Sequence, residues 1–235
     1  MDTPHLHRPL SRVAALRLAA GAAASLAFGL PAAAAAPVAT SVPPAEGLER
    51  LAAGNKRFVA GALTNNSDGL VERRLALTGH QAPFVTILSC SDSRVPLELV
   101  FDQNVGDLFV FRNAGNFVVD SVLGTLEYGY ASLGVKLIVV MGHEQCGAVS
   151  ATYDAIKNDK PLPPNLDIVQ KAIAPGIASV VSASGSKQDA VLANVRAQAE
   201  RLKGSPVLGP AIASGDCVVV AAEYRLGSGA VDILK

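Results

Sequence analysis

The feature that most constrains the fold is a set of three short, almost continuously apolar runs at residues 84–88, 108–111 and 137–141. Runs of this length are typical of strands that are buried on both faces, as in a parallel sheet. Segments that suit helices separate them, at residues 95–101 and 121–133. Because strands alternate with helices, we expect an α/β fold with a mostly parallel central sheet flanked by helices.

Further elements extend this pattern at both ends of the chain. Before the first strand, an amphipathic helix is expected over residues 47–63 and a short helix over 71–78. Beyond the third strand, helices are expected at 146–158, at 165–182 with an interruption at Pro175-Gly176, and at 187–203. Residues 217–224 and 230–234 are expected to pair as strands around a glycine-rich turn, which leaves an antiparallel strand at the C-terminal edge of the sheet.

The first 36 residues are typical of a secretory signal peptide. Arg8 and Arg12 precede an apolar stretch over 13–30, and an alanine-rich segment follows with cleavage expected near Ala36. The alternative is a membrane anchor, because the stretch is long enough to span a bilayer. Arg17 and two internal glycines favour cleavage. We therefore expect a periplasmic or secreted protein with no membrane attachment after cleavage.

The rest of the chain fits one domain with a small partner. Residues 37–45, rich in proline and alanine, are expected to form a linker, and residues 46–235 a single domain. The 20 basic residues balance 20 acidic ones, so the chain offers no electrostatic surface for nucleic acid. Tryptophan is absent, which argues against a stacking surface for single strands.

Polar residues follow the three expected central strands. Cys90 and His143 close two of them, and Arg112 closes the third. Ligand sites in open α/β sheets lie at the carboxyl ends of the strands. These side chains are therefore expected to converge at one edge of the sheet.

The cysteines point to a metal site rather than to a disulfide framework. Cys90, Cys146 and Cys217 are odd in number, and Cys217 begins an apolar strand, where it fits a core residue. His143 and Cys146 lie three residues apart across a strand-to-helix turn; this spacing alone more often marks a buried thiol beside a histidine. With Cys90 they form a set of three ligands, which is what a catalytic zinc needs beside an open fourth position.

Three segments resemble the signature segments of the β-class carbonic anhydrases. They are Cys-Ser-Asp-Ser-Arg at 90–94, Arg-Asn-Ala-Gly-Asn at 112–116 and Gly-His-Glu-Gln-Cys-Gly at 142–147. The similarity extends from Gly-Asn-Lys-Arg-Phe at 54–58 to the closing Tyr-Arg-Leu at 224–226, so it covers nearly the whole chain after the signal segment.

The resemblance implies a zinc enzyme that hydrates carbon dioxide reversibly to bicarbonate and a proton. The zinc ligands would be Cys90, His143 and Cys146. Zinc would lower the pKa of a bound water, and the resulting hydroxide would attack carbon dioxide. Asp92 would accept the hydrogen bond of that hydroxide, and Arg94 would hold Asp92 in place and keep it ionised. Since two thiolates cancel the formal charge of the ion, activity is expected to rise toward alkaline pH.

The resemblance also implies a substrate pocket and an oligomer. Gln81, Phe109 and Tyr128 match the family's pocket positions; ordinary packing is the alternative reading of all three. The family's dimer shares its active site across the subunit boundary, so a homodimer or homotetramer is implied.

A regulated form of the site is not expected. Some members of the family close the site at low pH, when the aspartate takes the fourth zinc position, and certain of these hold regulatory bicarbonate in a pocket that includes a tryptophan. Ile87 stands at the matching position here. We therefore expect the open form, with Asp92 on its arginine.

Three other functions fit parts of the same pattern. The same zinc site would serve a hydrolase of carbonyl sulfide or carbon disulfide. A non-catalytic zinc-binding domain would not need Asp92 and Arg94, both of which are present. Thiol redox chemistry would pair Cys90 with Cys146 as a disulfide.

Overall fold

The computed structural model describes residues 42–65 and 69–234. The expected signal peptide and most of the expected linker lie outside these residues. In the described part of the chain, no helix is both long and apolar enough to cross a membrane.

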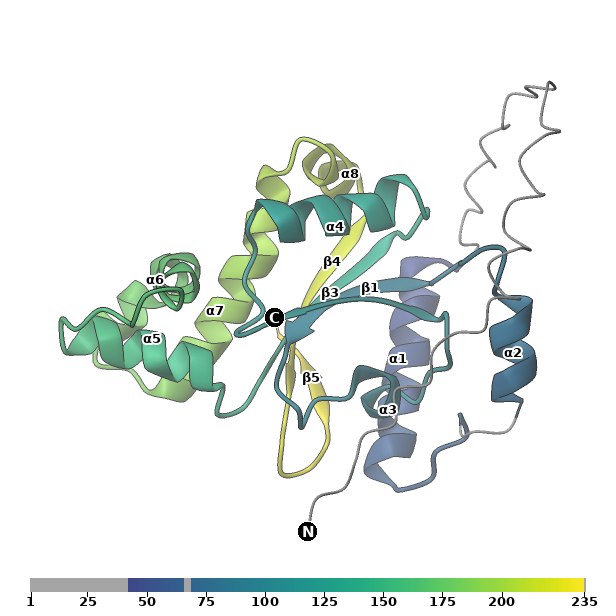
Figure 1. Ribbon diagram of the computed structural model, residues 1–235, viewed down its shortest axis with the longest axis horizontal. Coiled ribbons are helices and arrows are strands. Elements are labelled where there is room, and N and C mark those ends of the chain that lie inside the picture. The colour runs from purple at the N-terminus through teal and green to yellow at the C-terminus, as the bar shows by residue number, and fades with distance from the viewer. Residues whose placement is uncertain (1–41, 66–68, 235) are drawn as a thin grey trace, which may run out of the picture. The chain divides into compact units, whose positions relative to one another are not determined.

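A five-stranded sheet in the order β2-β1-β3-β4-β5 forms the centre of the fold (Figure 1). Its strands are β1 (Val85–Cys90), β2 (Leu108–Asn113), β3 (Leu137–His143), β4 (Val218–Tyr224) and β5 (Val231–Ile233). The first four are parallel, and β5 runs antiparallel to β4 at the edge. The expected α/β fold with a parallel centre and an antiparallel C-terminal edge is confirmed.

The helices follow the expected order with some differences in extent. They are α1 (Pro44–Val59), α2 (Leu70–Ala76), α3 (Leu97–Val100), α4 (Asp120–Ala131), α5 (Gly147–Lys157), α6 (Asp167–Ser182), α7 (Lys187–Arg201) and α8 (Leu208–Ser214), with a 3₁₀ turn η1 (Leu202–Gly204). The interruption expected at Pro175 is wrong, because α6 continues through it. Gly176 lets α7 approach closely, since a β-carbon there would lie 2.7 Å from that of Ala197, and this packing overrides the local preference.

Both faces of the sheet are covered by helices, because the strands are apolar on both sides. In β3, Leu137, Val139 and Met141 face a core shared with α1 and α3. Ile138 and Val140 face the opposite core, to which α4, α7 and α8 contribute. This arrangement agrees with the expected parallel sheet.

The edge strand β2 is less buried than expected. All of its residues are only partly buried, whereas β1 and β3 are buried throughout. The run over 108–111 is as apolar as the central strands, but the sheet order leaves β2 with one neighbour in this chain. The apolar sequence therefore predicted the strand correctly and its burial wrongly.

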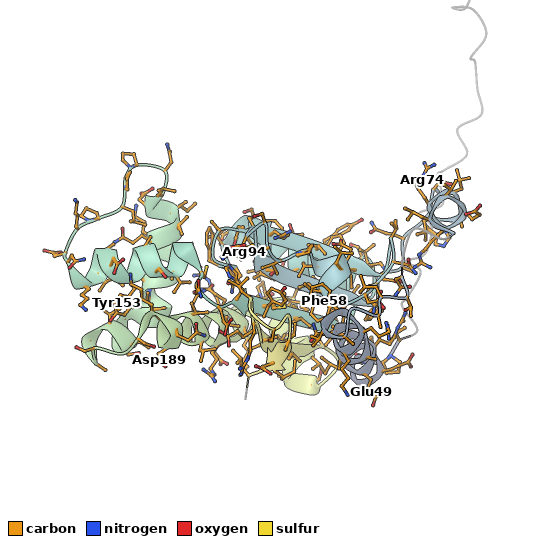
Figure 2. All side chains as sticks on the ribbon, turned by 90° about the horizontal axis from the view of Figure 1, so that it is seen from below. Glu49, Phe58, Arg74, Arg94, Tyr153 and Asp189 are labelled. Atoms are coloured by element: carbon orange, nitrogen blue, oxygen red, sulfur yellow. The ribbon has the colours of Figure 1, made fainter. Side chains whose placement is uncertain are left out.

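A helical lobe, formed by α5, α6 and α7, packs against the carboxyl ends of the strands. Its core contains Ile173 and Val191, and it also takes in Cys90 and Cys146. Arg94 lies near the boundary between the sheet and this lobe, which carries Tyr153 and Asp189 (Figure 2). The site described below lies at this boundary.

Candidate metal centre

Three metal-binding side chains meet where β1 and β3 end. One ligand atom from each of Cys90, His143 and Cys146 lies within 4.8 Å of the others, and all three side chains are buried. Cys90 and His143 end neighbouring parallel strands. A tight turn, in which Gln145 takes a positive φ of 55°, then brings Cys146 back beside His143 at the start of α5. The structure thus brings Cys90 and His143 together, as expected from their places at the strand ends, with Cys146 beside them.

The imidazole of His143 is oriented as a metal ligand. Its Nδ1 lies 2.8 Å from the backbone oxygen of Glu144. A carbonyl oxygen only accepts, so Nδ1 carries the proton and Nε2 presents a lone pair. Nε2 is buried and has no hydrogen-bond partner among the described residues. A buried polar atom rarely stays unpaired, and a cation between the imidazole and the two sulfurs would satisfy it.

The two thiols are coupled through their short separation. The sulfur atoms of Cys90 and Cys146 lie 4.0 Å apart, and both cysteines are free. The hydrogen bond from Cys146 lowers the pKa of Cys90 to about 4, with the Gly115 N–H contributing, against the opposing effect of burial. The same contact raises the pKa of Cys146, although the backbone at the start of α5 acts in the opposite direction. A divalent cation would allow both to be thiolates, because metal binding displaces the proton. The donor set therefore fits a metal such as zinc.

Asp92 and Arg94 form an ion pair beside these ligands. Arg94 donates to Asp92 through Nε, Nη2 and its own backbone N–H, at 2.8–2.9 Å. These bonds hold the pKa of Asp92 well below its usual range. Asp92 Oδ2 also lies 3.7 Å from His143 Nε2. An ionised carboxylate oxygen is thus kept next to the position where a metal would bind.

Arg112 had no predicted role beyond closing a strand, and the structure gives it one. Its guanidinium donates to the backbone oxygens of Cys90, at 2.8 Å, and Asp92, at 2.6 Å. These bonds fix the chain that carries a thiol ligand and the carboxylate. The sequence signal was a charged residue directly after an apolar strand, but nothing in the spacing showed that its partners are carbonyl groups.

The three expected pocket residues lie elsewhere in the chain. Phe109 pairs with Thr86 near the start of β1, and its ring centroid lies 6.1 Å from that of Tyr128. Four residues of strand, about 13 Å, separate Thr86 from Cys90. Gln81 is exposed and precedes β1. Within one chain these side chains therefore do not join the metal ligands.

Comparison with known proteins gives a consistent result. The family model described as carbonic anhydrase matches residues 85–231. The carbonic anhydrase of Mycolicibacterium smegmatis is 39% identical over 183 residues, which cover 77% of this chain and 88% of that protein.

Solved structures are similar in fold as well as in sequence. The β-carbonic anhydrase CafA of Aspergillus fumigatus has a TM-score of 0.63 and 26% identity, covering 78% of this chain and 88% of that one. Tetrameric β-carbonic anhydrases of Sordaria macrospora give a TM-score of 0.60 and 27% identity, with coverage of 76% and 93%. With the matching family model and the Cys–His–Cys group, these similarities show that the chain belongs to the β-class carbonic anhydrase family.

Proposed function

We propose that this chain is a zinc enzyme that catalyses the reversible hydration of carbon dioxide to bicarbonate and a proton. The observation that carries the proposal is the buried Cys90–His143–Cys146 group with an unpaired imidazole nitrogen. Two thiolates and one imidazole suit zinc, and three protein ligands leave a coordination position for a reactant. Bound zinc would supply a water molecule acidic enough to provide hydroxide near neutral pH.

Asp92 is proposed to orient the attacking oxygen. As an ionised carboxylate it only accepts hydrogen bonds, and its Oδ2 lies beside the ligand atom of His143. It would therefore accept the O–H of the attacking group and leave a lone pair aimed at carbon dioxide. Arg94 holds both carboxylate oxygens, so the acceptor stays charged and fixed. The open form of the site requires Asp92 to be paired with Arg94, as it is here. That Asp92 stays off the fourth zinc position when the metal is bound remains a prediction.

A second copy of the chain is proposed to complete the substrate pocket. Gln81, Phe109 and Tyr128 lie toward the opposite end of β1 and β2 from Cys90, so they need another subunit to reach a metal centre. The partly buried edge strand β2 offers an apolar surface for such a contact. In the composite site, Gln81 would donate to a substrate oxygen and Phe109 would form an apolar wall for a nonpolar gas. A homodimer or homotetramer is thus part of the proposal, and the tetrameric relatives support it.

Export to the periplasm or beyond is proposed from the N-terminal sequence alone. A basic start, an apolar stretch and an alanine-rich segment support it. N-terminal sequencing of the protein from the extracytoplasmic fraction is expected to show a start near Pro37. Protein that keeps residues 1–36 and stays with the cytoplasm would contradict export.

The proposed reaction is tested by stopped-flow hydration of carbon dioxide on protein of measured zinc content. The rate should rise from mildly acid to alkaline pH. A flat profile would contradict the expectation that two thiolates, by cancelling the formal charge of zinc, move the activity toward alkaline pH.

Release of sulfide from carbonyl sulfide and carbon disulfide is measured on the same sample. Sulfide release without carbon dioxide hydration would replace the proposed reaction. Stoichiometric zinc with neither activity would indicate a non-catalytic zinc domain, and a Cys90–Cys146 disulfide without zinc would indicate redox chemistry.

A further inference from the structure

The loop between β2 and α4 contacts the metal centre through one backbone group. The N–H of Gly115 donates to the Sγ of Cys90 at 3.3 Å. A hydrogen bond of this kind stabilises a thiolate and reduces the negative charge that the sulfur shares with a metal. The orientation of this peptide therefore affects the ligand directly.

Gly115 does not hold that orientation by itself. Its φ is 96°, and a β-carbon at this position would lie 2.7 Å from Cδ1 of Ile173 in α6. The close packing demands glycine, which has the widest conformational freedom of any residue. The conformation of the loop around Gly115 therefore depends on hydrogen bonds from outside the loop.

Two buried carboxamides on α7 supply such bonds. Asn194 Nδ2 donates to the backbone oxygen of Gly115 at 2.9 Å. Gln198, one turn later, accepts from the N–H of Val118 at 2.8 Å. Gln198 Nε2 also donates to Asn194 Oδ1, at 3.1 Å, which fixes the orientation of the Asn194 amide. Asn194 is 0% and Gln198 2% exposed, so water does not replace these bonds.

We propose that Asn194, oriented by Gln198, is a positioning residue for the metal centre: by holding the Gly115 carbonyl it aims the Gly115 N–H at the Cys90 sulfur. The inference rests on the proposed zinc site and adds two residues of α7 that lie outside the three signature segments. Asn194 touches neither ligand nor reactant, and it acts through the backbone of Gly115.

A purely structural role would predict a different pattern of effects. An asparagine in a helix interior has a poorer helix propensity than leucine, and burial of its amide is costly unless each bond is made. With a purely structural role, substitution would lower stability alone, because a substitute without an amide leaves the buried Gly115 carbonyl unpaired. The proposed role requires that loss of Asn194 alters the sulfur–metal bond even in protein that remains folded.

The experiment compares metal binding by the wild type and by Asn194→Leu. Zinc affinity is measured by competition with a chelator, and the thiolate-to-metal charge-transfer band is recorded with cobalt(II) in place of zinc. Asn194→Leu is expected to weaken zinc binding about tenfold or more. It should also move the cobalt band to longer wavelength, because a sulfur without its hydrogen bond donates more charge.

Asn55→Leu is the matched control. Asn55 is another buried asparagine, and it bonds the backbones of Val100, Gly229 and Val231. It lies in α1, which packs on the other face of the sheet from α7. Asn55→Leu is expected to lower the thermal midpoint as much as Asn194→Leu does, with zinc affinity and the cobalt band unchanged.

Gln198→Met provides a second variant, which keeps Asn194 but removes its orienting partner. Its effects on zinc affinity and on the cobalt band should have the same direction and a smaller size, and it decides the matter if Asn194→Leu does not fold. Folded variants that bind zinc and cobalt as the wild type does would overturn the positioning role alone. A wild-type protein that binds neither metal would overturn the proposed function as well.

Discussion

Asp92 lies between Arg94 and His143. Its Oδ1 accepts from Arg94 Nε at 2.9 Å and its Oδ2 from Arg94 Nη2 at 2.8 Å, while Oδ2 stays 3.7 Å from His143 Nε2. The side chain of Asp92 is 17% exposed, so it is mostly shielded from solvent. One carboxylate thereby connects the surface arginine to the buried imidazole.

Asp92→Asn is expected to lower kcat for carbon dioxide hydration by about 10²–10⁴-fold, the usual range for loss of one positioned acid–base group. The amide keeps the shape but replaces an acceptor oxygen with a donor. Zinc content should stay at the wild-type level, because Asp92 is not one of the three ligands. Stopped-flow rates and metal analysis on the same sample check both statements. A variant with full zinc and full activity would remove Asp92 from the mechanism.

Arg94→Gln is expected to cost less activity than Asp92→Asn, and the two effects should not add. Arg94 acts by holding the carboxylate, so it has little left to do once that carboxylate is gone. The double variant should therefore be about as active as Asp92→Asn alone. Multiplied losses in kcat would show that Arg94 acts on the reactants independently of Asp92.

A mixed-subunit experiment tests the composite pocket. Cys146→Ser removes a metal ligand, and Gln81→Ala removes a pocket residue proposed to come from the other subunit. In a mixed dimer, the Gln81→Ala chain supplies intact metal ligands and the Cys146→Ser chain supplies Gln81 to the same site. One of the two sites is therefore intact, and the other lacks both residues. Random mixing of the two nearly inactive variants should restore about a quarter of wild-type activity. If all the residues act within one chain, mixing will restore nothing.

Much of the fold could be predicted from the sequence, because the strands carry continuous apolar runs. The helix α8 (Leu208–Ser214) was not predicted: it is short, contains Pro210, and is stabilised by burial of Leu208 and Ala211 against the sheet. The partial burial of β2 follows from its place at the edge, which is a property of strand order. Local sequence carries neither kind of information.

The candidate site could be predicted in part for the same reason. The ligands stand directly after apolar strands, so their convergence follows from the parallel sheet. The position of Phe109 depends on strand register, and the sequence alone did not show that it lies far from Cys90 within one chain. Asn194 and Gln198 gave no signal at all, since two carboxamides one turn apart on a helix are common on exposed surfaces.

Asp102 gives a separate prediction about stability. Its fully buried carboxylate accepts from Arg57, from the backbone N–H groups of Thr64 and Asn65, and from the Thr64 hydroxyl. Burial opposes ionisation, but these bonds prevail and lower its pKa from 3.8 to about 2. The difference is worth roughly 2 kcal/mol. Because the folded-state pKa is the lower one, this stability is present above pH ~4 and is lost as the pH falls toward ~2.

Asp102→Ala should therefore destabilise the protein by about 2–3 kcal/mol at neutral pH, because it leaves the backbone N–H groups of Thr64 and Asn65 without their acceptor. Asp167→Ala, which breaks an exposed pair with Lys171, should cost less than about 1 kcal/mol. Urea unfolding between pH 7 and pH 2 measures both. The difference in stability between the two variants should shrink by about 2 kcal/mol between pH 7 and pH 2, and a constant difference across this range would exclude Asp102 ionisation as the cause.

The central claim is that the Cys90–His143–Cys146 group holds the zinc on which hydration depends. The most direct measurement is a titration of metal-free protein with zinc, in which carbon dioxide hydration is followed by stopped flow at each addition. The rate should rise in proportion to bound zinc and level off at one ion per chain. A rate that does not depend on zinc, or protein that holds one zinc per chain and hydrates no carbon dioxide, would contradict it.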